Sequence, residues 1–160
     1  MAFSFVCTPG YAGCTVLALR GELDITAAAE LSSQLTTVMS DESWVILDLA
    51  DLTFIDCSSL GVLAGALDRA RLAGGDVLLA RPREAVTRLL LLTGWARVFP
   101  VFPGVALAGF SAGLAAFSSR LAASGAGGSV AAAVEETATA AGATTGSGRS
   151  ACRPDYRGAA

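Results

Sequence analysis

Apolar residues in the first hundred positions alternate between short strand-like runs and stretches with helical spacing. Residues 3–7 and 14–20 are rich in aromatic, β-branched and aliphatic side chains, as strands usually are. The segment between them supplies Pro9, Gly10 and Gly13, which favour a turn. The pattern therefore predicts an antiparallel hairpin at the start of the domain.

Two units of helix and strand follow the hairpin. Residues 26–39 carry an apolar stripe at helical spacing, and residues 44–49 form a nearly unbroken apolar run, typical of a strand covered on both faces. Residues 58–73 repeat the helical spacing, end at a Gly-Gly pair and precede a strand at 76–80. A helix between two strands predicts a crossover connection and parallel pairing.

Residues 83–93 predict one further helix, and residues 98–101 a short strand that Pro100 assigns to an edge of the sheet. We therefore expect an α/β domain. Its sheet should be mixed but mainly parallel, with four or five strands, helices on it, and an antiparallel hairpin at the opening.

A closing helix is predicted after Pro103, where no charged residue occurs between Arg97 and Arg120. The prolines and the many Ala, Gly and Ser residues argue against a membrane span. Large apolar side chains recur there at a spacing of three and four, so we expect an amphipathic helix that lays this stripe on the sheet. A dimer helix or partner helix is the next interpretation. The stripe consists of Leu107, Phe110, Leu114, Phe117 and Leu121.

The composition changes again near residue 124. Residues 124–160 consist largely of Ala, Gly, Ser and Thr and contain almost no large apolar side chain. Such a segment cannot bury enough surface to offset the entropy of ordering it. We therefore predict a folded domain over residues 1–123 and a disordered tail over 124–160.

The chain has 160 residues, a net charge of −3, and neither His nor Lys. This excludes a Ser-His-Asp triad, a His-ligated metal and a P-loop lysine, and the charge is too acidic for the usual basic nucleic-acid module. The four cysteines form no C-x-x-C pair, so no zinc ribbon is indicated. We expect no cofactor, no metal, no signal peptide and a cytoplasmic location.

The segment with most chemical character is Asp-Cys-Ser-Ser at residues 56–59, where an apolar stretch turns into a helix. Asp56 can cap this helix by accepting from the backbone N–H of Ser58 or Ser59, in which case the serines are ordinary cap residues. Gly61 leaves bare backbone one turn later, where another surface could approach closely. A Cys57 or Ser58 nucleophile would have only a carboxylate as its base, so we do not expect an enzyme.

Two motifs carry a family resemblance: Gly-Glu-Leu-Asp at residues 21–24 and Asp-Cys-Ser-Ser-Leu-Gly at residues 56–61. They closely resemble the motifs of the bacterial anti-sigma-factor antagonists, which are single STAS domains and whose second motif is Asp-Ser-Ser-Gly-Leu-Gly or Asp-Cys-Ser-Gly-Leu. The resemblance covers about residues 3–120 and implies a STAS-like fold.

The resemblance implies a partner-switching function for Ser58. In this family the matching serine is phosphorylated by an anti-sigma factor that is itself an ATP-dependent serine kinase. The unphosphorylated antagonist binds the anti-sigma factor and frees a sigma factor, phosphorylation ends the binding, and a metal-dependent serine phosphatase restores it. The antagonist has no catalysis of its own and binds neither nucleic acid nor membrane directly. The residues expected to contact the partner are Asp24, Asp56, Cys57, Ser59 and Gly61.

Several alternatives stay open. Ser59 stands where the family usually has Gly and is a second candidate for the phosphate, and Cys57 replaces the first serine of the commoner motif. Asp24 has a purely structural interpretation as the cap of the helix that begins near Thr26. The rival function is a STAS scaffold or transporter-associated subunit that is never phosphorylated, and a weak homodimer is a further expectation.

Overall fold

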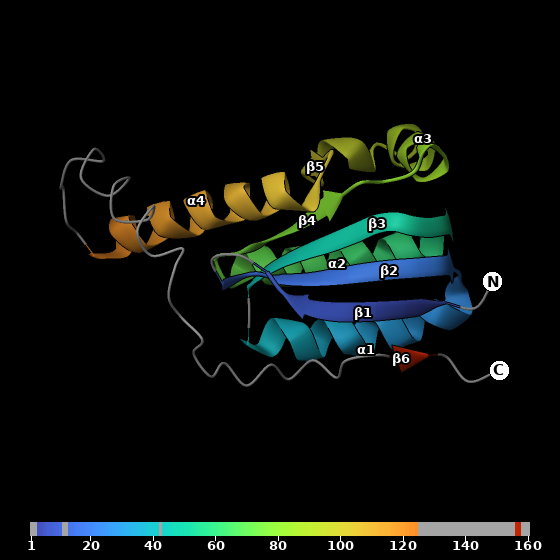
Figure 1. The fold of residues 1–160 in the computed structure, drawn as a ribbon, viewed down its shortest axis with the longest axis horizontal. Coiled ribbons are helices and arrows are strands. Elements are labelled where there is room, and N and C mark those ends of the chain that lie inside the picture. The colour runs from blue at the N-terminus through green and yellow to red at the C-terminus, as the bar shows by residue number, and fades with distance from the viewer. Residues whose placement is uncertain (1–2, 11–12, 42, 125–155, 158–160) are drawn as a thin grey trace.

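The computed structural model describes residues 3–10, 13–41, 43–124 and 156–157, which form one mixed sheet flanked by helices (Figure 1). The hairpin, the crossovers and the α/β class predicted from the sequence are confirmed. The elements are β1 (Ser4–Pro9), β2 (Thr15–Leu23), α1 (Ile25–Asp41), β3 (Trp44–Ile55), α2 (Cys57–Leu72), β4 (Asp76–Ala80), α3 (Glu84–Leu92), the 3-10 helix η2 (Trp95–Arg97), β5 (Val101–Phe102), α4 (Val105–Ser124) and β6 (Tyr156–Arg157).

The strands lie in the order β5-β4-β3-β2-β1-β6. β1 runs antiparallel to β2, with Ser4 opposite Arg20, whereas β2, β3, β4 and β5 are parallel neighbours. Because parallel strands end at the same edge of a sheet, the residues that follow β2 and β3 come together there. This edge positions the site described below.

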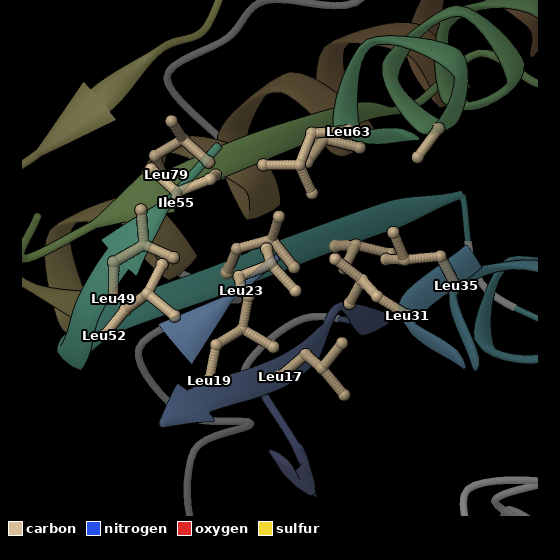
Figure 2. Close-up of a cluster of buried hydrophobic side chains, with 14 of the residues drawn as sticks. Leu17, Leu19, Leu23, Leu31, Leu35, Leu49, Leu52, Ile55, Leu63 and Leu79 are labelled. Carbon is tan, nitrogen blue, oxygen red and sulfur yellow. The ribbon is translucent and has the colours of Figure 1, made fainter. Parts of the chain in front are cut away.

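Alternate residues of the central strand β3 enter two different cores. Val45 and Leu47 point to the larger core, which α1 and α2 cover, and Ile46 points to the smaller core beneath α4. Figure 2 shows leucines of β2, β3, α1 and α2 converging in the larger core. A strand buried on both faces needs an almost continuous apolar run, which explains the sequence of residues 44–49.

The pairing of β2 with β3 is interrupted twice. The register shifts between Ala18 and Arg20 and again between Gly21 and Glu22, and at each shift β3 carries one residue more than β2. Leu52 and Ile55 are buried, but Phe54 is half exposed. These irregularities break the strict alternation of a strand, and β3 continues to Ile55, beyond the predicted end at Leu49.

The orientation predicted for the closing helix is wrong. α4 lies against the sheet through Ala108 and Ala112, which are buried, whereas Leu107, Phe110 and Leu114 are 55%, 72% and 58% exposed. Of the other two residues of the predicted stripe, Phe117 is half-buried, and the side chain of Leu121 lies outside the described part of the structure. The sheet face beneath α4 is already filled by larger side chains of the strands, so only small residues let the helix approach it closely. Among the described residues, no helix is long and apolar enough to cross a membrane.

The last predicted strand is shifted. Residues 95–97 form η2 instead of leading into a strand, and β5 begins at Val101, after Pro100. Pro100 has no N–H to donate, but its carbonyl accepts from Leu79 N–H at 2.9 Å, so it stands where the ladder starts. β5 is at the end of the strand order, as expected for a strand next to a proline.

The tail also departs from expectation at two residues. Tyr156 and Arg157 form β6, which pairs antiparallel with Phe5 and Ser4, so the sheet has six strands rather than four or five. The outer edge of β1 offers unpaired backbone groups that an extended segment can satisfy without being apolar. The rest of the predicted disordered tail, residues 125–155 and 158–160, lies outside the described residues.

A close approach of two loops supplies a test of this fold. A Cβ added to Gly75 would overlap the carbonyl oxygen of Ser43, where the chain enters β3 beside β4. We expect Gly75→Ala to lower the free energy of unfolding by about 3 kcal/mol, since backbone must shift, and Tm by about 6–12 °C. Calorimetry checks this. Gly65→Ala is the control, because its Cβ would meet only Arg69 Nη1, at 3.7 Å, and an unchanged Tm for Gly75→Ala would contradict the packing.

Candidate functional site

Two helices begin side by side at the carboxyl ends of β2 and β3. Asp24 follows β2 and precedes α1, and Asp56 follows β3 and precedes α2. The Asp56 N–H donates to the carbonyl of Leu23 at 3.1 Å, which joins the end of β2 to the start of α2. The structure therefore brings together two motifs that are 32 residues apart in the sequence.

Both aspartates cap their helices. Asp24 Oδ1 accepts from the N–H groups of Thr26 and Ala27 at 2.9 and 3.0 Å and from Thr26 Oγ1 at 2.6 Å. Asp56 Oδ1 accepts from Ser59 N–H at 2.7 Å. The predicted cap roles of both residues are confirmed. Two of the open backbone N–H groups at the start of α1 are satisfied by Asp24, and one at the start of α2 is satisfied by Asp56.

The same hydrogen bonds keep both carboxyl groups ionised. The pKa of Asp24 lies below its ordinary value, first because the Thr26 hydroxyl donates to it and then because Ala27 N–H does. The pKa of Asp56 is lowered chiefly by the N–H of Ser59, while the negative charge of Asp24 acts in the opposite direction. The two carboxylates are therefore near enough to repel each other, and this edge of the sheet is negatively charged at neutral pH.

Ser58 and Ser59 are neighbours in sequence but differ completely in environment. Ser59 is 0% exposed, and its Oγ donates toward the carbonyls of Leu23 at 3.1 Å and Asp24 at 3.3 Å. Ser58 is exposed in the first turn of α2. The serine hydroxyl available to a second protein is thus that of Ser58, and Ser59 acts as a structural link between the two helix starts.

The other predicted site residues lie on the same outer surface. Cys57 is an exposed free thiol at the first position of α2. Gly61 is exposed one turn after Ser58, and a Cβ added there would meet no atom within 4 Å. The predicted residues Asp24, Asp56, Cys57, Ser58 and Gly61 therefore gather around one surface, with Ser59 beneath it.

Two exposed apolar residues close in sequence to the capping aspartates were missed by the sequence analysis. Ile25, directly after Asp24, is 68% exposed, and Phe54, two residues before Asp56, is 50% exposed. Phe54 stands in an apolar stretch that suggests burial, and the register shift beside it leaves no regular pattern in the sequence. Exposed apolar side chains beside charged caps are typical of surfaces that bind another protein.

The capping carboxylates of the site are committed to the two helix starts. Within the part of the chain that the structure describes, no three or more His, Cys, Asp or Glu side chains gather as metal ligands. The carboxylates that flank Ser58 are engaged by backbone N–H groups. The arrangement can present a hydroxyl, two negative charges and an apolar rim to a second molecule.

This chain is similar to known proteins in sequence and in fold. The anti-sigma F factor antagonist of Paenibacillus polymyxa is 27% identical to this chain over 92 residues, which are 56% of this chain and 79% of that protein. The crystal structure of an anti-sigma factor antagonist from Mycobacterium paratuberculosis has a TM-score of 0.60 at 22% identity, covering 69% of this chain and 94% of the other.

The same fold also occurs in another context. A sulfate transporter family protein from Wolinella succinogenes has a TM-score of 0.59 at 18% identity, covering 68% of this chain and 92% of the other. At such identities the likeness concerns the fold alone. Residues 6–108, more than half of the sequence, match the STAS domain. The strand order, the two capped helix starts and this match together lead to one conclusion: the chain belongs to the STAS domain family.

Proposed function

We propose that this protein is a cytoplasmic anti-sigma-factor antagonist that is switched at Ser58. Its unphosphorylated form binds an anti-sigma factor with serine kinase activity, and phosphorylation of Ser58 by that kinase ends the binding. A metal-dependent serine phosphatase restores the unphosphorylated form. The protein itself is a binding module and a kinase substrate, with no reaction of its own.

The observation that carries this proposal is the contrast between the two serines. Ser58 is exposed at the start of α2, whereas Ser59 is completely buried and donates to the carbonyls of Leu23 and Asp24. A kinase can reach the first hydroxyl without unfolding the domain. Phosphorylation of Ser59 would require breaking the contact that holds α2 to the end of β2.

The phosphoryl transfer needs no group of this chain other than the hydroxyl. The bond between the γ-phosphorus of ATP and its bridging oxygen breaks, a bond from Ser58 Oγ to that phosphorus forms, and ADP leaves. The hydroxyl proton passes to a base of the kinase. The product adds a charge of about −1.5 to −2 to a side chain that was neutral.

Electrostatics explain why the added phosphate would end binding. Asp56 is two residues from Ser58, its carboxylate already occupies the Ser59 N–H, and Asp24 adds a second negative charge nearby. The phosphate would therefore be repelled by these two carboxylates and would not find the Ser59 N–H free to bind it. A partner that covers the site would also have to desolvate the phosphate. A loss of about 2.8 kcal/mol already corresponds to a hundredfold loss of affinity.

The surface around Ser58 has the mixed character that a protein partner requires. The exposed side chain of Ile25 supplies apolar contact, and the two capping carboxylates favour a partner with cationic groups. Gly61 leaves room for the partner's backbone to come close. These features suit a stable but charge-sensitive contact.

The rival function is a STAS scaffold or transporter-associated subunit in which Ser58 is never modified. The fold alone does not separate the two, since a sulfate transporter family protein shares it. Phosphorylation of Ser58 would separate the two functions, because only the antagonist is a kinase substrate. Purified anti-sigma factors of the serine-kinase class from the source organism are incubated with this protein, ATP and Mg²⁺, and the products are mapped by mass spectrometry.

In that assay we expect one phosphate, on the peptide that contains Ser58. Ser58→Ala should abolish it, because Ser59 is inaccessible in the folded domain, and a native antagonist of each kinase serves as the positive control. A phosphate on Ser59, or an unmodified protein beside kinases that phosphorylate their own antagonists, would contradict the proposal.

Charge at position 58 should control affinity. Ser58→Asp is expected to weaken binding of the anti-sigma factor that phosphorylates the protein by about a hundredfold, and Ser58→Ala to leave it unchanged, as measured by calorimetric titration. Ser119→Asp, which adds the same charge to an exposed serine of α4, is the matched control. Equal affinities for the Asp and Ala variants would count against a charge-based switch.

Gly61 provides a separate test of close approach. Gly61→Ala should keep or raise the free energy of unfolding, by up to about 1 kcal/mol, because Ala is the better helix former and its Cβ would meet nothing. The same variant should weaken partner binding by about tenfold or more. Gly65→Ala, in the same helix, should not affect binding. Full affinity of Gly61→Ala would show that the partner does not approach this turn.

A further inference from the structure

α4 presents an apolar stripe that no part of the described chain covers. Leu107, Phe110 and Leu114 lie on successive turns of one side of the helix and are 55%, 72% and 58% exposed. The opposite side of α4, with Ala108 and Ala112, packs on the sheet. Three such side chains expose roughly 300–400 Å² of apolar surface, an area typical of interaction sites on otherwise polar proteins.

The stripe also carries no charge, and the serine hydroxyl beside it already has a hydrogen-bond partner. No ionisable residue occurs from Val105 to Ser119. Ser118, which lies beside the stripe, donates its hydroxyl to the carbonyl of Leu114 at 2.9 Å, so its donor needs no partner from outside the helix. An occupant must therefore be apolar at this surface and can be uncharged, because there is no charge for it to complement.

The chain's own C-terminal segment does not fit as the occupant. Residues 125–160 contain only Val130, Val134 and Tyr156 as large apolar residues, apart from one cysteine. Tyr156 belongs to β6, which pairs with β1, whereas α4 contacts β3, β4 and β5 at the other side of the strand order. Figure 1 shows β6 and α4 in separate parts of the molecule.

A second copy of the same chain fits the pattern. A two-fold axis requires a surface that matches itself when the helix direction is reversed. Leu107 lies three residues before Phe110 and Leu114 lies four residues after it, so the spacing of these three exposed residues is nearly the same in both directions. In an antiparallel pair of α4 helices, Leu107 faces Leu114 of the partner subunit and the two Phe110 rings meet near the axis.

The absence of charge on the stripe permits the same occupant. Each copy carries a net charge of −3, so two copies repel at long range, and an uncharged contact surface adds no direct like-charge contact to that repulsion. The first charge of the helix, Arg120, comes six residues after Leu114, and an interface of Leu and Phe side chains has no ion to desolvate. The face that carries α1 and α2, with Ser58, stays free when α4 is covered, because α4 lies on the opposite face of the sheet.

We propose that α4 is a homodimerisation helix, which pairs antiparallel with α4 of a second copy through Leu107, Phe110 and Leu114. The apolar patch and its surroundings would bury roughly 1,000 Å² in total, below the roughly 1,200–2,000 Å² of stable specific interfaces and in the range of weak ones. The dimer is therefore weak, with a dissociation constant on the order of 10–100 µM. This inference does not depend on the proposed function.

The first experiment is sedimentation velocity of the full chain at concentrations from about 1 to 500 µM. We expect a shift from monomer to dimer within this range. Phe110→Asp should shift the midpoint at least about tenfold upward, with an unchanged Tm because the side chain is exposed. Leu72→Asp, which adds the same charge at an exposed apolar residue of α2 on the opposite face of the sheet, is the control and should leave dimerisation unchanged. A chain that is monomeric throughout, or a dimer insensitive to Phe110→Asp, would overturn the proposal.

A second experiment tests the antiparallel register. Leu107→Glu and Leu114→Arg should each weaken self-association, because each places a charge against a leucine. An equimolar mixture of the two variants should associate more tightly than either alone, since the new Glu of one copy then faces the new Arg of the other. Absence of this rescue would exclude the antiparallel pairing. In a parallel pair, each position faces the same position of the second copy, so the new Glu and the new Arg would not meet.

Discussion

The site depends on one carbonyl group, that of Leu23, at the end of β2. It accepts from the Asp56 N–H and from the Ser59 hydroxyl, both at 3.1 Å, and so holds the start of α2 against the end of the neighbouring strand. Ser59 has no access to water, so its hydroxyl must find these backbone partners or leave a buried polar group unsatisfied. With Ser59 held inward, Ser58 points to the surface.

The same contact accounts for the departure from the family motif at residue 59. A glycine there would leave the turn free but would offer no hydroxyl to the carbonyls of Leu23 and Asp24. The serine exchanges conformational freedom for a buried hydrogen bond, which fixes the two helix starts relative to each other. A rigid, pre-ordered surface loses less entropy when a partner binds to it.

The sheet separates two kinds of surface. On the side of α1 and α2, large leucines fill the core (Figure 2), and the helix starts carry the charged, hydroxyl-bearing site. On the other side, α4 contacts the sheet through alanines and turns its large apolar side chains outward. Two different partners can therefore be accommodated without competing for the same face.

The periodicity of apolar residues was sufficient to predict a strand or helix wherever the burial of that element follows a regular pattern. Residues 44–49 are buried on both sides, and a continuous apolar run is the only pattern that satisfies such a strand. The caps Asp24 and Asp56 were predictable because a carboxylate before a helix satisfies local backbone donors. Local chemistry of this kind is encoded within a few residues and needs no knowledge of the rest of the fold.

Features that arise between distant segments were not predictable in the same way. A helix with one apolar side and one alanine side gives two candidate core faces, and the sheet chose the alanines because the strands had already filled the space. The exposure of Phe54 followed from register shifts, and β6 from an open strand edge. The sequence by itself determined the elements, their order and the capped serine motif, whereas the tertiary structure decided which of two serines faces solvent and which side of α4 is buried, because both depend on the volume and hydrogen-bond partners that remote strands supply.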